Sequence, residues 1–244
     1  MEEINQAVQE GNVQKCIELL QMIPPERPTV ILIHGKANSG KSYTAKRIQK
    51  ELKSKEFSAS KLAQNVQDAL KPVCGYEPVT VAFADLLKAH LFATDKIQVS
   101  DLTAPDKTAA YREILISTAD TALAHYGAGY FAKALQAQIM LWFACNEKHV
   151  FIVPDLRTKC QLEIMEQSGC DLIKITINAK ERVIVNRLLE TDFDTERAGR
   201  LAAHISETDL DDWLDTRELA ESHGFIFVEN DFDAQELQDL PSSG

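Results

Sequence analysis

The stretch that decides the fold is Val30-Ile31-Leu32-Ile33-His34-Gly35-Lys36-Ala37-Asn38-Ser39-Gly40-Lys41-Ser42. It begins with an apolar run, which is typical of a strand buried on both faces. From Gly35 the residues match the pattern G-x-x-x-x-G-K-S/T at every fixed position, and a helical pattern follows over 42–54. A strand, a glycine-rich turn and a helix in this order predict a phosphate-binding loop. The alternative, a turn without a ligand, leaves Lys41 and Ser42 without a function.

The residue types explain how such a loop would hold the phosphates of ATP. Glycines let the backbone turn its N–H groups inward, and the following helix directs its positive end at the anion. Lys41 is expected to reach the β- and γ-phosphates, and the Ser42 hydroxyl is expected to bind Mg²⁺. The predicted ATP-binding residues of this segment are Gly35, Lys36, Ala37, Asn38, Ser39, Gly40, Lys41, Ser42 and Tyr43.

Around this stretch, short β-rich runs alternate with longer helical patterns. This alternation predicts an α/β domain of three layers, with a five-stranded parallel sheet and helices on both faces. The expected strands are 30–34, 79–84, 150–153, 172–177 and 225–229. The expected helices are 42–54, 60–70, 85–92, 107–126, 130–146, 158–168, 180–190 and 194–204, with a surface loop at 93–106.

The chain is expected to hold one main domain, over 29–244, after a helical extension over 1–28. Amphipathic patterns at 3–22 break near Gly11, and a proline-rich connector leads into the first strand. We interpret the extension as a packing or interaction element. A mobile lid is expected at about 180–210.

Composition excludes several classes of partner. The 244 residues contain 37 acidic and 26 basic residues, for a net charge of -11. Non-specific electrostatic binding to nucleic acid or to an anionic membrane is therefore not expected. The protein's partner is predicted to be a small-molecule substrate, and a homodimer is compatible with the sequence.

The termini and cysteines favour a cytoplasmic protein, in a host cell if the source is viral. The start of the chain is acidic and lacks the features of a signal peptide. The five scattered cysteines form no C-x-x-C pair, so we expect reduced thiols and no cysteine metal site.

A carboxylate for the metal is expected at the end of a strand near the loop. Asp155 ends the apolar run 150–153, and Arg157 lies two residues later. One turn would then offer a carboxylate to Mg²⁺ and a guanidinium to phosphate. The alternative is that Asp155 caps the next helix.

Further charged residues surround the same predicted crevice. Asp85 and Lys88 follow the second expected strand, and Arg112 lies early in an otherwise apolar helix. Each of the three is interpreted as a residue that binds the acceptor. The alternative is a helix cap for Asp85 and an exposed helix position for Lys88 and Arg112.

Arginines gather in the expected lid. Arg197 and Arg200 would share one face of the helix 194–204 with His204 and neutralise the transferring phosphoryl group; Arg182 and Arg187 precede them. The acidic run near Trp213, with Asp209, Asp211, Asp212 and Asp215, is interpreted as surface.

Together, these segments resemble the phage-type deoxynucleoside monophosphate kinases, a branch of the P-loop kinases related in pattern to animal phosphomevalonate kinases. The likeness covers about 29–240. It rests on the glycine-rich loop, Phe83-Ala84-Asp85-Leu86-Leu87-Lys88, Arg112, Asp155-Leu156-Arg157, His204-Ile205-Ser206-Glu207, and Asn230-Asp231 before Glu236-Leu237.

The resemblance implies a P-loop kinase fold and transfer of the ATP γ-phosphoryl group to a deoxynucleoside monophosphate. By position, Lys88, Arg112 and Arg157 would meet the acceptor phosphate, and Asn230 would lie near the adenine. The predicted catalytic residues are Lys41, Asp155, Arg157, Arg197 and Arg200, and the metal ligands are Ser42 and Asp155.

Two alternatives stay open. Thr118-Ala119-Asp120 stands where the family has Gly-Thr-Asp, so the acceptor is either a deoxynucleotide or another small phosphorylated compound, such as phosphomevalonate or a modified nucleotide. The second alternative is a regulatory protein that binds nucleotide without turnover.

Overall fold

The apolar run before the glycine-rich loop forms the central strand of the sheet. In the computed structural model, which describes residues 27–36, 39–54, 62–94, 109–145, 148–179 and 208–230, β1 spans Thr29–His34. It pairs in parallel with β3 (His149–Leu156) on one side and β4 (Asp171–Asn178) on the other. Two outer strands, β2 (Glu77–Thr80) and β5 (Phe225–Glu229), complete a parallel sheet of order β2-β3-β1-β4-β5.

Helices connect these strands. Their bounds are α3 (Lys41–Ser54), α4 (Gln64–Leu70), the 3₁₀ turn η1 (Lys71–Val73), α5 (Asp85–Ala93), α7 (Ala109–Tyr126), α8 (Tyr130–Cys145), α9 (Lys159–Glu166), α13 (Asp211–Leu214) and α14 (Arg217–Ser222).

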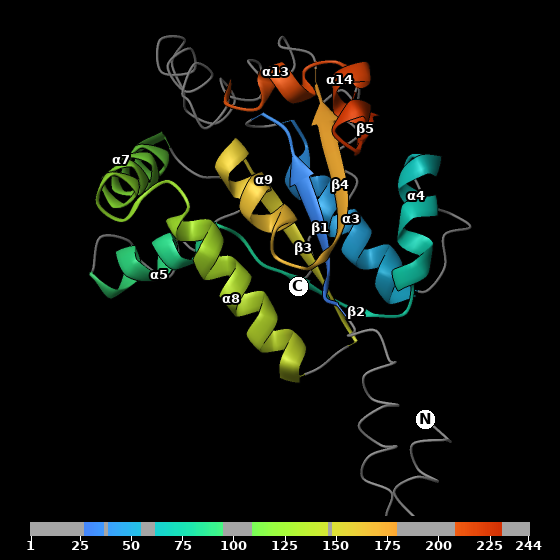
Figure 1. Ribbon diagram of the computed structural model, residues 1–244, viewed down its shortest axis with the longest axis horizontal. Helices are drawn as coiled ribbons and strands as arrows, with labels where there is room; N and C mark the ends of the chain where they lie inside the picture. The colour runs from blue at the N-terminus through green and yellow to red at the C-terminus, as the bar shows by residue number, and fades with distance from the viewer. Residues whose placement is uncertain are drawn as a thin grey trace, which may run out of the picture.

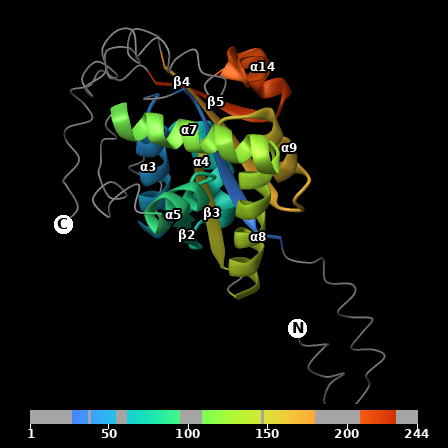
Figure 2. The same cartoon turned by 90° about the vertical axis from the view of Figure 1, so that its left-hand side faces the viewer.

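Alternate residues of β1 enter two separate cores, because successive side chains of a strand point to opposite faces. Ile31 and Ile33 pack with buried residues of α3 and α4, whereas Val30 and Leu32 pack with those of α5, α7, α8 and α9. Figure 1 shows α3 and α4 on one side of the sheet and α8 and α9 on the other. Figure 2, turned by 90°, shows α5, α7 and α8 in front of the strands. The three-layer arrangement follows from this division.

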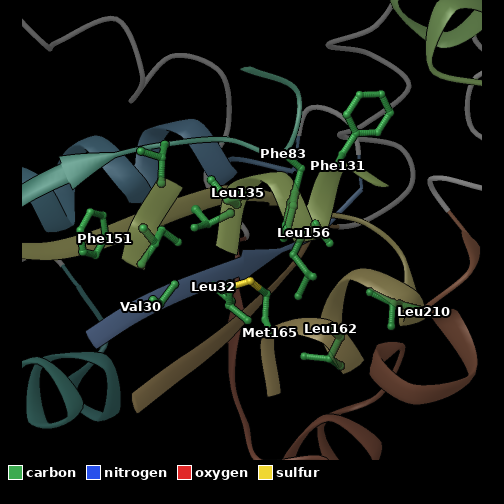
Figure 3. Close-up of a cluster of buried hydrophobic side chains, with 14 of the residues drawn as sticks. Val30, Leu32, Phe83, Phe131, Leu135, Phe151, Leu156, Leu162, Met165 and Leu210 are labelled. Atoms are coloured by element: carbon green, nitrogen blue, oxygen red, sulfur yellow. The ribbon is translucent and has the colours of Figure 1, made fainter. Parts of the chain in front are cut away.

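The larger core lies between the sheet and α8 and α9. Leu32 of β1, Phe151 of β3, Leu135 of α8 and Met165 of α9 are buried in it (Figure 3). Burying one such side chain typically contributes about 1.5–3 kcal/mol. This packing holds the carboxyl ends of β1 and β3 side by side.

The second strand ends earlier than the sequence predicts. It spans Glu77–Thr80 instead of 79–84. Residues 82–84 form a turn instead, which is closed by a hydrogen bond of 3.0 Å from the Asp85 N–H to the Ala82 carbonyl oxygen. The carboxylates of Asp85 and Asp155 also accept hydrogen bonds from main-chain N–H groups of this turn, as described below. Pro78 is tolerated because β2 is an edge strand.

Other boundaries also differ from expectation. The helix expected at 60–70 begins at Gln64, and β3 extends to Leu156. Two short helices, α13 and α14, occupy a stretch for which none was expected. The extension over 1–28, apart from its last two residues, lies outside the described residues, as do the helices expected at 180–190 and 194–204 and most of the expected lid.

The predicted fold class is confirmed. The chain forms an α/β domain with a five-stranded, all-parallel sheet and helices on both faces, as expected for a P-loop kinase fold. No helix in the described part of the chain has the length and apolar character needed to cross a bilayer. Cys74, Cys145, Cys160 and Cys170 are free thiols.

Candidate phosphate-binding site

Two glycines set the shape of the loop between β1 and α3. Gly35 has φ 150°, and a Cβ there would lie 2.7 Å from the Ile177 carbonyl oxygen. Gly40 has φ 105°, and a Cβ there would lie 2.3 Å from Nδ2 of Asn230. Real Cβ atoms do not approach neighbours so closely, and L side chains rarely adopt these φ values. The loop therefore requires glycine at both fixed positions.

The Lys41 ammonium turns back over this loop. Its Nζ donates to the Gly35 carbonyl oxygen and, at 2.6 Å, to that of Lys36. Lys41 is buried as the first residue of α3. This ammonium therefore lies at the N-terminal end of a 14-residue helix, where the helix dipole also favours an anion.

Ser39 and Asn230 form the base of the loop. The Asn230 side-chain amide donates to the Ser39 carbonyl oxygen over 2.6 Å, and its main-chain N–H donates to the Asn178 carbonyl oxygen over 2.7 Å. The Ser39 hydroxyl is buried and has no hydrogen-bond partner among the residues that the structure describes. A buried polar group without a partner is costly in a folded protein, so this hydroxyl is a candidate ligand group.

His34 joins the loop to the end of β3. Its Nδ1 lies 3.2 Å from the Leu156 carbonyl oxygen, which assigns the ring proton to Nδ1. Burial, with the positive charge of Lys41 nearby, lowers the pKa of the imidazole to about 3. The side chain is therefore neutral at physiological pH, and it lies in the fields of both Lys41 and Arg157.

Asp155 holds the turn that follows β2. Its Oδ1 accepts from the Phe83 N–H at 3.0 Å and its Oδ2 from the Ala84 N–H at 3.1 Å. Burial raises the pKa of this carboxyl, while the two N–H groups and the charges of Arg157 and Lys88 act in the opposite direction. Asp155 thus has a structural role that the sequence did not indicate.

The helix-cap reading of Asp155 is wrong. Thr158 caps α9, and its Oγ1 accepts a hydrogen bond from the Gln161 main-chain N–H at 3.3 Å. In return, Oε1 of Gln161 accepts from the Thr158 N–H at 3.2 Å. The same Gln161 side chain accepts from the Arg157 N–H at 2.9 Å. The main chain at Arg157 is therefore fixed by this capping box.

Asp85 and Lys88 form an ion pair at the start of α5. The Lys88 ammonium lies 3.1 Å from Oδ1 of Asp85, whose Oδ2 accepts from the Ala82 N–H at 2.7 Å. Because Asp155 holds the adjoining residues of the turn, this pair lies beside the end of β3. Asp85, Lys88 and Arg157, which were predicted to bind the acceptor, are therefore brought together around Asp155, the predicted metal ligand.

The acidic run at and beside α13 lies at the surface, as expected, and two of its carboxylates also contact the loop, which the sequence did not indicate. Nζ of Lys36 lies 3.1 Å from Oδ2 of Asp211 and 3.7 Å from Oδ1 of Asp215. These carboxylates are one helical turn apart, a spacing that places them on one face. That spacing was readable in the sequence, but its partner was not.

The other carboxylates of this run hold the start of α9. Oδ2 of Asp209 accepts from the Lys159 N–H at 2.7 Å, and Oδ2 of Asp212 pairs with Nζ of Lys159 at 2.7 Å. Trp213 lies under the same ammonium, 5.0 Å from ring centre to Nζ, and stacks on His223. Figure 1 shows α13 and α14 at the end of the sheet beside the arrowhead of β4.

Several predicted residues lie outside what the structure describes. Ala37, Asn38, Arg197, Arg200 and His204 are among them, as is the Arg112 side chain, although its main chain belongs to α7. Ser42 is exposed in the first turn of α3, and Tyr43 is partly buried. Their roles stay predictions.

The described residues fit a phosphate group well. The glycine cradle, the Lys41 ammonium and the buried Ser39 hydroxyl are the groups that a polyphosphate requires. For Mg²⁺ the available groups are the exposed Ser42 hydroxyl and the remaining lone pairs of Asp155. No group of three or more His, Cys, Asp or Glu side chains suited to a metal occurs within the described ranges.

The chain is distantly similar to several solved structures. A putative kinase from Chloroflexus aurantiacus J-10-fl is 12% identical, with a TM-score of 0.40 over 88% of this chain and 92% of that chain. No protein-family model matches the chain, and no curated protein matches it.

Proposed function

We propose that this protein is an ATP-dependent phosphotransferase that transfers the γ-phosphoryl group to the phosphate of a deoxynucleoside monophosphate, giving the diphosphate. The phosphate loop carries the proposal. Neither Gly35 nor Gly40 has room for a side chain, the Lys41 ammonium lies over the loop, and the Ser39 hydroxyl is buried without a partner among the described residues. Binding of a polyphosphate would account for these features together.

The acceptor side of the proposal rests on charge. Lys88 and Arg157 both lie within the electrostatic reach of Asp155, and Arg157 also acts on His34, the last residue before the loop. The Arg157 guanidinium thus acts at the ends of both β1 and β3, and a positive charge there suits an anionic acceptor. An acceptor phosphate is already ionised, so no strong general base is needed, and catalysis would depend on alignment and charge neutralisation.

Mg²⁺, when bound, would neutralise charge on the terminal phosphates. Ser42 and Asp155 are the side chains proposed to hold it. Two side chains of the protein would act beside it. Lys41 would stabilise the negative charge of the transferred group, and Arg157 would orient the acceptor phosphate. Asn230 is proposed to lie close to the nucleotide as well as supporting the loop.

The test is a panel of acceptors with purified full-length protein, ATP and Mg²⁺, read as acceptor-dependent ADP release. The panel contains the four deoxynucleoside monophosphates, their ribonucleotide counterparts and phosphomevalonate. We expect release with at least one deoxynucleoside monophosphate and none with the matching nucleoside, which lacks the acceptor phosphate. If every deoxynucleoside monophosphate fails, the proposed acceptor is wrong.

Other outcomes separate the remaining functions. Release with phosphomevalonate or another small phosphorylated compound alone would keep the phosphotransferase and replace its acceptor. Binding of Mg-ATP without release for any acceptor would indicate a nucleotide-binding regulatory protein. Absence of Mg-ATP binding would reject the whole proposal.

A further inference from the structure

The phosphate loop is tied to α13 by an ion pair. The Lys36 ammonium faces Asp211 and Asp215, and the exposed fractions of the three side chains are 38%, 28% and 58%. Lys36 is part of the loop itself, so its charge is available either to these carboxylates or to a bound polyphosphate. Two carboxylates against one ammonium also leave a net negative charge at the edge of a site for an anion.

The carboxylates lie on a fixed support. Leu210 and Leu214, which flank and end α13, are buried in the larger core. On its other side the segment is held by Asp209 and Asp212 through the main-chain N–H and the ammonium of Lys159. A lysine, by contrast, carries its charge on a flexible four-carbon stem. Lys36 is therefore the member of the contact that is able to move.

We propose that Asp211 and Asp215 act as an electrostatic latch on Lys36, which a bound triphosphate must release, and that they thereby lower the protein's affinity for ATP. This inference rests on the proposed function. Asp211 and Asp215 are positioning residues in it, because they act on the nucleotide only through Lys36. The latch reduces nucleotide affinity without altering the glycine cradle or Lys41.

A purely structural tie predicts something different. If the ion pair only stabilised the loop, loss of either partner would weaken ATP binding. In the latch, the two partners have opposite effects. Freeing Lys36 from its carboxylates strengthens ATP binding, and removing Lys36 weakens it.

The experiment measures the dissociation constant of Mg-ATP by calorimetry for the full-length protein and its variants. Asp211→Asn with Asp215→Asn is expected to lower the constant about threefold to tenfold, and Lys36→Met to raise it by a similar factor. The matched control is Glu163→Gln with Glu218→Gln, which removes the same charge from exposed positions of α9 and α14 but leaves the Lys36 contacts and the support of α13 in place. Its change in the constant is expected to be less than about twofold.

A double-mutant cycle separates the latch from simple repulsion between the carboxylates and phosphate. If the latch operates, the Asp211→Asn and Asp215→Asn pair increases the affinity for Mg-ATP more when Lys36 is present than in the Lys36→Met background. An equal or larger gain without Lys36 would show direct repulsion and overturn the latch.

The remaining outcomes are also decisive. Weaker or unchanged ATP binding in the Asp211→Asn and Asp215→Asn variant, with normal binding by the wild type, overturns the latch and leaves the proposed function intact. Failure of the wild type itself to bind Mg-ATP overturns both.

Discussion

The side-chain amide of Asn230 donates a hydrogen bond to the main-chain carbonyl oxygen of Ser39 over 2.6 Å, joining residues that are 191 positions apart. Asn230 directly follows β5 and is buried. Its own N–H is bonded to Asn178 at the end of β4. The glycine-rich loop between β1 and α3 is therefore supported by the residue that follows β5, which also contacts the end of β4.

Asn230→Asp tests this support with almost no change in shape. The substitution places a carboxylate oxygen against the Ser39 carbonyl and adds negative charge under an anion site. We expect the free energy of unfolding to fall by about 1–3 kcal/mol and the dissociation constant of Mg-ATP to rise at least tenfold. Urea unfolding and calorimetry measure the two effects.

The matched control is Asn178→Asp. It makes the same chemical change at an exposed side chain of the neighbouring strand, where only the main-chain carbonyl takes part in the contact. Equal losses in the two variants would contradict a specific role for the Asn230 amide.

Gly40→Ala should separate steric exclusion from backbone strain. The new methyl group would lie 2.3 Å from Asn230 Nδ2, at φ 105°. Gly127→Ala is the control, because it also has a positive φ, 91°, but nothing lies within 4 Å of its Cβ position. Both variants are expected to lose about 1 kcal/mol of stability from the backbone conformation. Only Gly40→Ala should also lose Mg-ATP binding, and equal binding by both variants would reject the close packing of the loop.

His34 is expected to make the fold sensitive to acid. Its pKa is about 3 in the fold and about 6.5 in the unfolded chain. Between these values the unfolded chain takes up a proton that the fold excludes, so stability is fully present above pH 6.5 and is lost as the pH falls toward 3. At pH 5 the loss amounts to about 2 kcal/mol.

The test compares wild type with His34→Asn, whose amide retains a donor toward Leu156 but does not titrate. Urea unfolding at pH 7.5 and pH 5 should show a decrease in the wild type that is larger by about 2 kcal/mol than the decrease in the variant. Parallel decreases would show that another group controls acid stability.

Lys41→Met should abolish phosphoryl transfer and leave the fold nearly intact. Methionine keeps most of the buried stem but loses the ammonium that lies over the loop. We expect kcat to fall at least about a hundredfold, as for other preorganised charges at a reacting centre. The free energy of unfolding should fall by about 1–3 kcal/mol, because the Gly35 and Lys36 carbonyl oxygens lose their donor, and the variant stays folded. Lys46→Met, at an exposed position of the same helix, is the control and should retain activity; retained activity in Lys41→Met would refute the mechanism.

Local patterns predicted the parts of this protein that depend on neighbouring residues. The apolar run of β1, the glycines and Lys41 are readable because strand, turn and helix follow one another directly in the chain. The early end of β2 was not readable, since it depends on Asp155, which is more than 70 positions from the turn that it holds.

The short helices were missed for a related reason. α13 has four residues and α14 has six, so neither has enough turns for a periodic pattern, and each is held in place by burial of single side chains such as Leu214 and Ala220. The link from Lys36 to Asp211 depends on that packing. Sequence alone therefore indicated an acidic face without indicating its partner.

Asp155 offers the sharpest distinction between a metal ligand and a positioning residue. Both of its oxygens accept main-chain N–H groups, and an asparagine can satisfy only one of them, because its amide group would face the other N–H. Asp155→Asn should therefore disturb the turn that carries Asp85 and Lys88. The expected loss of stability is about 1–3 kcal/mol, with a rise in the KM for the acceptor.

The dependence of activity on Mg²⁺ then decides the role. If Asp155 only positions the turn, the Mg²⁺ concentration for half-maximal activity stays unchanged while the KM for the acceptor rises. If its remaining lone pairs also bind the metal, loss of the carboxylate charge raises that Mg²⁺ concentration as well, by about tenfold or more. A raised Mg²⁺ requirement with an unchanged KM for the acceptor would instead show that Asp155 acts on activity through the metal alone, since a disturbed turn would displace the groups proposed to face the acceptor.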